Sequence, residues 1–172
     1  MNKSLADLAK IVHAANIKWW QDIDTGEPIK RNPLELLSLV ISELSECLEG
    51  ERKNLMDDKL PHRKMAEVEM ADAKIRLLDF AEGFGCAVCP HDLMDPIPEN
   101  KGEAIFRIME SVISIGGSVT SAWLDLSIAY IDAYCIKHGY DLDGAFEEKM
   151  AFNSTREDHT HEARRIAGGK QF

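Results

Sequence analysis

The sequence predicts an all-α protein, a bundle of packed helices. Apolar residues recur at spacings of three and four along most of the chain, and clusters of Pro and Gly separate the periodic segments. No run alternates convincingly with a period of two, which is the pattern of a half-buried strand. The composition, 45% apolar and 29% charged, is that of an ordinary globular chain. We therefore expect residues 1–172 to form a single all-α domain.

The first helix is expected from Ser4, a good N-cap, to about Trp20. Trp19 continues its apolar stripe and is therefore expected in the core. The segment "QDIDTGEPIKR" interrupts the pattern. Asn32 followed by Pro33 is an N-cap and first-turn pair, which predicts a second helix from there to about residue 53. The apolar stripe of the first helix comprises Leu5, Leu8, Ile11, Val12, Ala15 and Trp19.

A third helix is expected over about residues 63–82, ended by the sequence "GFG". After "CPHDLMDPIPENKG", apolar periodicity predicts helices over about 103–114 and 118–137, with Gly116 and Gly117 between them. Trp123 in this pair is expected in the core. A last helix over about 142–153 precedes a polar tail.

Acidic residues of the third helix share one strip of its surface. At about 100° per residue, with Glu69 at 0°, Asp72 falls near 300° and Arg76 near 340°. Asp79 lies on the same strip. Apolar residues flank the strip on both sides, as in a helix at the centre of a bundle. Because buried charges need partners, we expect the strip to face a cavity, a subunit contact or a bound ion.

The remaining acid of this segment, Glu67, falls on the opposite side of the helix. Lys74 lies beside it there at the same angular position. We expect these two side chains to form an ordinary solvent-exposed ion pair.

The second helix repeats the acidic arrangement, because Glu43 and Glu46 are three residues apart and lie on one face. The short connection predicts that the two helices are antiparallel neighbours, so their four carboxylates can converge. Two like charges about 4 Å apart repel by about 4 kcal/mol at an effective dielectric constant near 20. A divalent cation would relieve this repulsion, and oxygen ligands favour magnesium or manganese over zinc. Acidic pairs also occur on solvated helix faces, so the spacing alone leaves both interpretations open.

Charge and hydropathy exclude two classes of partner. The net charge of −10 repels phosphate backbones, which argues against a nucleic-acid-binding protein. No window approaches the roughly 18 consecutive apolar residues that a membrane-spanning helix needs. The N-terminal segment also lacks the pattern of a signal peptide. We therefore expect a cytoplasmic protein that does not contact a membrane.

The cysteines are too few and too scattered for a disulfide framework. Only "CAVCPH", with Cys86, Cys89 and His91, suggests a zinc or redox site. A zinc site needs four ligands, and the sequence offers no second pair to complete it. Structural cysteines are the favoured interpretation.

Three segments together resemble a known family. "ISELSECLEGERK" contains an ExxE pair, "EVEMADAKIRLLDF" contains ExxD, and "HGYDLDGAFEEKMAFNSTRE" contains the pattern KMxxNxxR. In this order they resemble the MazG-like nucleotide pyrophosphohydrolases of the all-α NTP pyrophosphatase superfamily, which also includes dimeric dUTPases and dCTPases. The resemblance implies hydrolysis of a nucleoside triphosphate between its α and β phosphates, giving monophosphate and pyrophosphate. It also implies four magnesium ligands: Glu43, Glu46, Glu69 and Asp72.

Two segments depart from the family pattern. The stretch over about 84–138 is longer than expected and predicts an inserted helical hairpin, which would cap the site or form a subunit interface. After Arg156 the chain reads "EDHTHEARR", where a Pro and a short basic tail are often found.

The expected chemistry needs a base and several cations. Hydrolysis requires neutralised phosphoryl oxygens and an aligned nucleophile, which magnesium bound to carboxylates and phosphates supplies. Glu43 or Glu46 is expected to accept the proton of the attacking water, and the spacing does not choose between them. The remaining phosphate charge requires basic side chains. The candidates are Lys149, Arg156, Arg52 and Lys53.

The resemblance places nucleobase contacts in the first helix. His13, Asn16 and Trp20 lie there, and Asn153 of the C-terminal motif is a further candidate. An Asn can read the edge of a base, and a Trp offers a face for stacking.

Helices that are apolar on two sides leave surface to bury between subunits, so we expect a homodimer or a homotetramer. A different class of protein remains open. The chain could be a catalytically inert helical module, whose acid pairs only keep it in solution or sense a cation. The enzyme is favoured by Lys149, Asn153 and Arg156, because an inert bundle does not require these residue types together with the acids.

Overall fold

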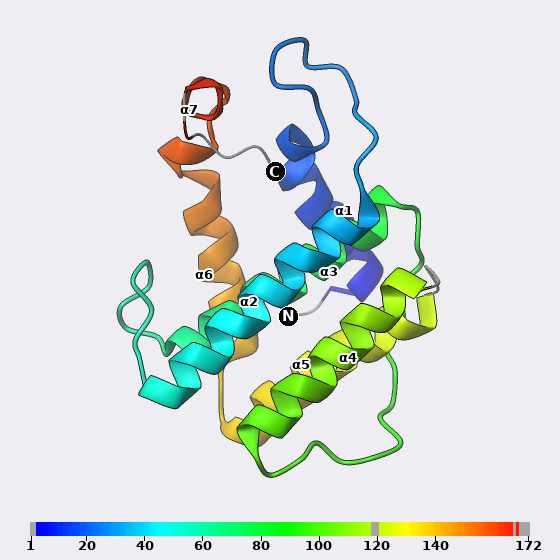
Figure 1. Ribbon diagram of the computed structural model, residues 1–172, viewed down its shortest axis with the longest axis vertical. Helices are drawn as coiled ribbons and strands as arrows, with labels where there is room; N and C mark the ends of the chain where they lie inside the picture. Colours follow the sequence, from blue (N-terminus) through cyan, green and yellow to red (C-terminus); the bar gives the residue numbers. More distant parts are fainter. Residues whose placement is uncertain (1–2, 118–120, 167, 169–172) are drawn as a thin grey trace.

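The structure, a computed structural model, describes residues 3–117, 121–166 and 168 and confirms the all-α fold (Figure 1). The described residues form no strand and contain two isolated β-bridges. None of their helices is long and apolar enough to cross a membrane. The elements are α1 (Leu5–Asn16), η1 (Ile17–Trp19), α2 (Pro33–Lys53), α3 (Met65–Gly83), α4 (Lys101–Gly117), α5 (Ser121–His138), α6 (Leu142–Ser154), η2 (Glu157–His159) and α7 (His161–Arg165).

Helix α2 has the predicted bounds because both of its ends are capped. The Asn32 side chain accepts a hydrogen bond from the Leu34 N–H at 3.0 Å, and Pro33 occupies the first turn. At the other end Asn54 adopts a left-handed conformation with φ of 52° and closes the helix after Lys53.

Helix α1 is shorter than predicted. Ser4 caps it, as expected, by accepting a hydrogen bond from the Asp7 N–H at 3.2 Å. The α-helix ends at Asn16, and the tighter 3₁₀ turn η1 follows. Its buried stripe is narrower than the predicted one, because Ile11 and Ala15 are exposed. The buried residues are Leu8, Ala9 and Val12.

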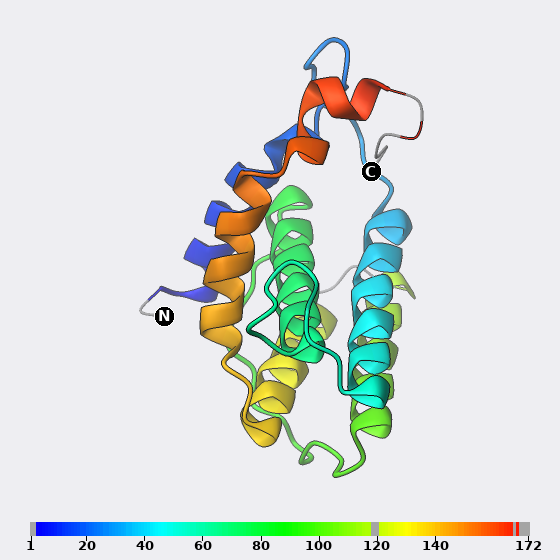
Figure 2. The same cartoon turned by 90° about the vertical axis from the view of Figure 1, so that its left-hand side faces the viewer.

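Helix α3 is the centre of the fold, as predicted, and contacts α1, α2, α5 and α6. Figure 2 shows it between α6 and α2, with α2 and α3 running in opposite directions. Between residues 66 and 81 every residue of α3 is buried except Asp72, Arg76 and Asp79. These three lie on the predicted polar strip, so the strip is the one side of the helix that other helices leave partly uncovered.

The predicted solvent-exposed pair of Glu67 and Lys74 is wrong. Both residues are buried, at 8% and 5% exposure. Glu67 instead accepts hydrogen bonds from Arg63 at 3.1 Å and from the Asp141 backbone N–H at 2.7 Å. Lys74 forms an ion pair with Asp132 on α5. The helical angle placed these residues on the far side of α3 correctly, but α5 and the start of α6 cover that side.

The hairpin of α4 and α5 extends the core on the other side of the bundle. Helix α4 packs on α2 and α5 packs on α3. Gly116 and Gly117 were predicted to lie between two helices, and this is wrong, because both belong to the last turn of α4. The predicted start of the next helix at residue 118 lies outside the described residues. Trp123 was expected in the core but is 39% exposed.

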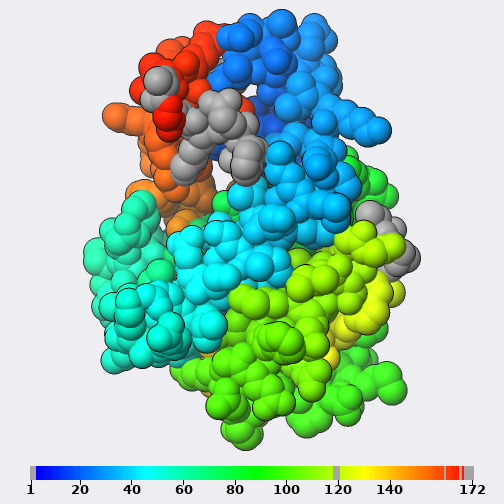
Figure 3. All heavy atoms as spheres, in the orientation of Figure 1, coloured from blue at the N-terminus to red at the C-terminus, as the bar shows by residue number. Residues whose placement is uncertain are grey.

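The polar tail expected after α6 contains two short helical elements, η2 and α7. It packs against the region around η1, and Figure 3 shows the C-terminal atoms in red beside the N-terminal atoms in blue. Arg165 forms an ion pair with Asp24 at 3.1 Å, which joins the two ends of the chain.

Candidate functional site

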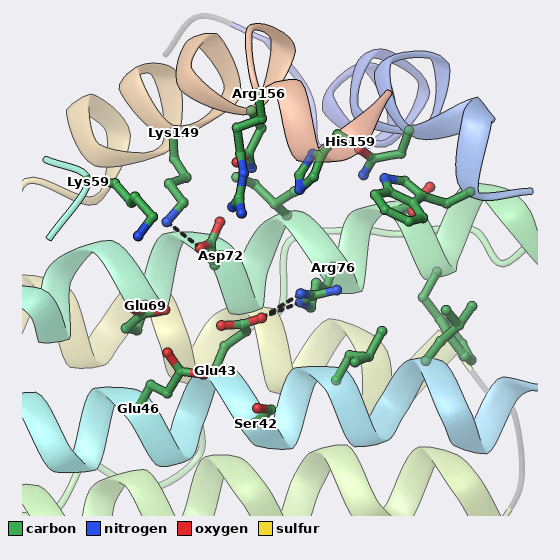
Figure 4. Close-up of a pocket in the computed structure, with 18 of the residues that line it drawn as sticks. Ser42, Glu43, Glu46, Lys59, Glu69, Asp72, Arg76, Lys149, Arg156 and His159 are labelled. Atoms are coloured by element: carbon green, nitrogen blue, oxygen red, sulfur yellow. Dashed lines mark hydrogen bonds and ion pairs between the residues drawn. The ribbon is translucent and has the colours of Figure 1, made fainter. Parts of the chain in front are cut away.

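A cavity of about 460 Å³ lies over the polar strip of α3, between α2 on one side and α6 on the other (Figure 4). Carboxylates and lysines gather at one end, and aromatic and amide side chains line the other. Its polar and aromatic lining residues are Asn16, Trp19, Arg31, Ser42, Glu43, Glu46, Asp58, Lys59, Glu69, Asp72, Arg76, Asp79, Phe80, Lys149, Asn153, Arg156 and His159.

The four predicted acids meet in this cavity. One carboxylate oxygen each from Glu43, Glu69 and Asp72 lies within 4.8 Å of the other two. Glu46 lines the same cavity one turn along α2 from Glu43. Figure 4 shows Glu43 and Glu46 of α2 pointing toward Glu69 of α3, and Asp72 pointing toward Lys149. The convergence predicted from the ExxE and ExxD spacing is therefore present.

Burial makes this cluster electrostatically costly. Burial, and then the charges of Asp72 and Glu43, raise the pKa of Glu69 to about 9. Burial also raises the pKa of Asp72 to about 6, although the nearby Lys149 opposes the shift. The pKa of Glu46 rises for the same reason, with Glu43 as the second cause. Near neutral pH the cluster therefore holds a proton, in a place where a cation could replace it.

Two basic side chains partly neutralise the cluster. Arg76 contacts the Glu43 Oε1 atom through Nε and a terminal nitrogen, both at 2.6 Å. Lys149 reaches down from α6 to Asp72 at 2.7 Å and is itself 5% exposed. Burial is the largest single influence on the pKa of Lys149 and lowers it, but the charge and hydrogen bond of Asp72 and the charges of Glu69 and Asp57 together outweigh it, so the pKa is raised. Lys149 is therefore a permanent cation inside the cavity.

Of the three other predicted cations, one lies in the cavity and two do not. Arg156 lines the cavity and also pairs with Asp158 at 2.6 Å. Arg52 and Lys53 do not line the cavity. They are well exposed and form ion pairs with Glu49 at the end of α2. Their place on the outer face corrects the prediction that they accompany the acids.

Lys59 lines the charged end of the cavity from the loop between α2 and α3, where no periodic pattern in the sequence points to it. The buried side chain of Asp57 accepts hydrogen bonds from the backbone N–H groups of Lys59 and Leu60, at 2.9 and 2.6 Å. This turn holds Lys59 over the cluster. An Asp two residues before a Lys in a loop is the signal that could have found it. Arg76 is the second missed residue, although its place on the acidic strip was recognised.

At the opposite end of the cavity Asp79 organises several of the predicted base-contacting residues. His13 Nδ1 lies 2.7 Å from its Oδ1 atom, and the indole N–H of Trp20 donates to it at 3.1 Å. Burial raises the pKa of Asp79, and these hydrogen bonds, together with one from Asn16, oppose the shift. His13 and Trp20 therefore lie behind the cavity wall and support it, whereas Asn16 lines the cavity.

The two tryptophans exchange their expected places. Trp20 is 8% exposed and packs so closely on Gly83 that a Cβ atom there would lie 2.2 Å from its ring. Trp19, expected in the core, is half-buried and lines the cavity. The reason is the switch from α1 to η1, because a 3₁₀ turn rotates successive side chains by about 120° where an α-helix rotates them by about 100°.

Asn153 has a further property that points to a ligand. Its Oδ1 atom is buried and has no hydrogen-bond partner among the described residues, and the side chain lines the cavity. A buried acceptor without a partner is costly, so a donor from a bound molecule would stabilise it.

The sequence features outside this cavity do not form a second site in the described part of the chain. Cys86 is half-buried, Cys89 is exposed, and both are free thiols. Among the described residues the one group of three or more ligand-type side chains with metal spacing is that of Glu43, Glu69 and Asp72. The lining residues include none from the α4–α5 hairpin, so in the described part of the chain the hairpin does not cap the cavity.

Comparisons of the chain with protein-family models, with curated proteins and with solved structures give no match. The case for a function therefore rests on the chemistry of this cavity and on the sequence motifs that supply its residues.

Proposed function

We propose that this protein is a magnesium-dependent nucleoside triphosphate pyrophosphohydrolase of the MazG-like type. It would cleave a ribo- or deoxyribonucleoside triphosphate between the α and β phosphates and release pyrophosphate. The observation that carries the proposal is a single cavity with buried carboxylates and lysines at one end and aromatic and amide groups at the other. Its volume lies within the range of small-molecule sites.

The donor set fits a hard divalent cation. Glu43, Glu69 and Asp72 would hold Mg²⁺, or Mn²⁺, through oxygen atoms alone. Such an ion neutralises the phosphoryl oxygens and activates water when it is bound. The raised pKa values of Glu69 and Asp72 support the fit, since they mark carboxylates whose burial and mutual repulsion Lys149 only partly compensates.

The basic residues would bind the triphosphate. Lys149 and Lys59 lie at the charged end of the cavity, and Arg156 lies at its rim (Figure 4). The buried Lys149 stays charged because of Asp72, so it supplies a fixed positive charge to phosphate oxygens. Arg76 has a different role from these phosphate-binding residues, because it contacts Glu43 and orients that carboxylate.

Glu46 is the best placed general base. Arg76 engages the Oε1 atom of Glu43, so that oxygen already accepts from a guanidinium and is not free to accept from water. The pKa of Glu46 is instead raised, by burial and by the charge of Glu43, toward the neutral range in which a general base works best. Glu46 would therefore accept the proton of the water that attacks phosphorus.

The nucleoside would occupy the other end of the cavity. Trp19 offers a ring for stacking, and Asn16 and Asn153 offer hydrogen-bonding groups to a base or sugar. The unpaired acceptor on Asn153 calls for a donor such as an amino or hydroxyl group.

The test is a panel of canonical and oxidised nucleoside triphosphates incubated with the protein and Mg²⁺. We expect monophosphate and pyrophosphate in equal amounts. Glu69→Gln should reduce the rate by at least about 100-fold, since it removes a metal ligand. Glu49→Gln is the matched control, because this carboxylate lies on the exposed side of α2 and pairs with Arg52 and Lys53.

Two results would contradict the proposal. Release of inorganic phosphate in place of pyrophosphate would place the cleavage at a different bond. No product from any nucleotide, with the protein folded, would favour the catalytically inert, cation-sensing module instead.

A further inference from the structure

The segment after Arg156 contacts the 3₁₀ turn that carries Trp19. This C-terminal segment, residues 157–165, forms η2 and α7 and packs against η1. Arg164 is 3% exposed, and its guanidinium carbon lies 4.1 Å from the centre of the Trp19 ring. The same guanidinium donates a hydrogen bond to the Lys18 carbonyl at 2.7 Å. A buried arginine thus joins the end of the chain to the backbone and the side chain of the 3₁₀ turn.

A second residue of the segment reaches the same ring. His159 contacts Trp19 edge-on, with ring centroids 5.2 Å apart and planes at 83°. Both side chains line the cavity, and Figure 4 shows His159 at the end away from Glu46 and Glu69. On the opposite side of the turn, Arg31 donates a hydrogen bond to the Trp19 carbonyl. Trp19 is therefore held by Arg31 at its backbone and by the C-terminal segment at its ring.

We propose that the C-terminal segment determines how tightly the protein binds the nucleoside part of its ligand, with Arg164 as the positioning residue for Trp19. This inference rests on the proposed function. Arg164 covers one side of the indole ring and attracts it through a cation–π interaction, which holds the ring in one orientation. A base can gain stacking energy only from a ring that is already in place, since ordering a mobile side chain on binding costs affinity.

The effect of Arg164 should be confined to the nucleoside. Arg164 contacts the Trp19 ring and the Lys18 carbonyl, and it does not line the cavity. The carboxylate cluster and Lys149 lie on α2, α3 and α6 and take no part in these contacts. Loss of Arg164 should therefore raise KM and leave kcat nearly unchanged.

The test compares two ligands that share a triphosphate and differ in the nucleoside. Calorimetry would measure the Kd of non-hydrolysable α,β-imido nucleoside triphosphates and of inorganic tripolyphosphate, each with Mg²⁺. For Arg164→Met we expect the nucleotide Kd to rise about tenfold and the tripolyphosphate Kd to stay within about twofold. Arg164→Lys should give an intermediate value, because it keeps the charge and loses the planar group.

Controls separate this role from a structural one. Arg107→Met removes an exposed arginine of α4 and should change neither Kd. If Arg164→Met does not fold, as judged by its melting curve, His159→Ala should show the same selective loss of nucleotide binding. Nucleotide, but not tripolyphosphate, should also quench tryptophan fluorescence in the wild type, and Trp19→Phe should remove that quenching.

The outcomes distinguish the two proposals. If both variants weaken both ligands equally, or neither ligand, the inference about the C-terminal segment is wrong. If the wild type binds nucleotide but releases no pyrophosphate, the proposed reaction is wrong and the inference stands. A wild type that binds tripolyphosphate as tightly as nucleotide overturns the inference alone, and one that binds neither overturns both.

Discussion

At the scale of single residues, the most informative feature is the set of carboxylates on α2 and α3 whose pKa values are displaced. Glu69 and Asp72 are held among like charges and away from water, which raises the pKa of Glu69 to about 9 and that of Asp72 to about 6, so Glu69 holds a proton near neutral pH. Lys149 and Arg76 compensate only part of the negative charge. Proteins seldom keep such an arrangement for stability, which is why perturbed carboxylates in a cavity are good candidates for a functional site.

The first prediction concerns Glu69 and pH. In the ion-free protein its pKa is raised from 4.5 to about 9, so the bound proton favours the folded state. That stabilisation is complete below about pH 4.5 and is lost as the pH rises through about 9. In EDTA we expect the melting temperature to fall between about pH 6 and pH 9, and Glu69→Gln, which remains neutral, to lose much of this fall.

Scanning calorimetry at several pH values measures this effect. Added Mg²⁺ should raise the melting temperature of the wild type more at about pH 8 than at about pH 6, because protons compete with the cation. Glu49→Gln should behave as the wild type does. An identical pH dependence in Glu69→Gln and the wild type would contradict the assigned pKa.

The second prediction concerns the general base. Glu46→Gln should lower kcat by about 10²- to 10⁴-fold and remove the acidic limb of the pH–rate profile, with little change in KM. The reason is that Glu46, with its raised pKa, must lose its proton before it can accept one from water. If Glu43→Gln removes the limb and Glu46→Gln does not, the roles of the two residues are reversed.

At the scale of elements, the junction between α1 and η1 decides which aromatic side chain enters the cavity. The chain leaves α-helical geometry after Asn16, so Trp20 turns into the core and Trp19 turns toward the cavity. Trp20 is fixed there by Gly83 near the end of α3 and by its hydrogen bond to Asp79. The short polar elements η2 and α7 then cover the junction.

The third prediction tests this junction. A Cβ atom at Gly83 would lie 2.2 Å from the Trp20 ring, so Gly83→Ala forces the indole or α3 to move. We expect a loss of about 1–3 kcal/mol in the free energy of unfolding. The matched control is Gly117→Ala at the end of α4, where a Cβ atom would meet nothing within 4 Å.

The control variant should be unchanged or more stable by about 0.5 kcal/mol, because alanine is the better helix former. Urea unfolding followed by circular dichroism measures both variants. Equal stability of the two variants would show that Trp20 can leave its position at no cost, and the account of the junction would then be wrong.

At the scale of the whole molecule, the fold separates the cavity from the hairpin. Helix α3 is covered by α1, α2, α5 and α6, and Figure 2 shows it between α6 and α2. The cavity lies over its polar strip between α2 and α6. On the other side of α2, an apolar groove runs between α2 and α4. It is lined by Leu34, Leu37, Ser38, Ile41, Val112, Ile113 and Gly116. Leu34 and Ile113 are 57% and 65% exposed, which is unusual for neighbouring large apolar side chains.

The fourth prediction is that this groove is where two copies of the chain meet. The sequence predicts a homodimer or a homotetramer, and burying the groove between two copies would remove its exposed apolar area from water. Ile113→Glu should shift the protein to monomers in light scattering after size exclusion. Lys10→Glu, on the exposed face of α1, is the control. A wild type that is monomeric at high concentration would contradict the prediction.

The sequence by itself determined the all-α fold, the bounds of α2, the central place of α3 and the meeting of four acids. Each of these follows from a period or a cap within one segment, since i, i+3 spacing fixes which side chains share a face. Tertiary structure alone decided what covers each face. It buried Glu67 and Lys74 under α5 and α6, left Arg52 and Lys53 outside, and brought Lys59 over the cluster. It also exchanged Trp19 and Trp20 and placed Arg164 against the former, because a 3₁₀ turn and a contact between the two ends of the chain depend on packing that no local pattern encodes.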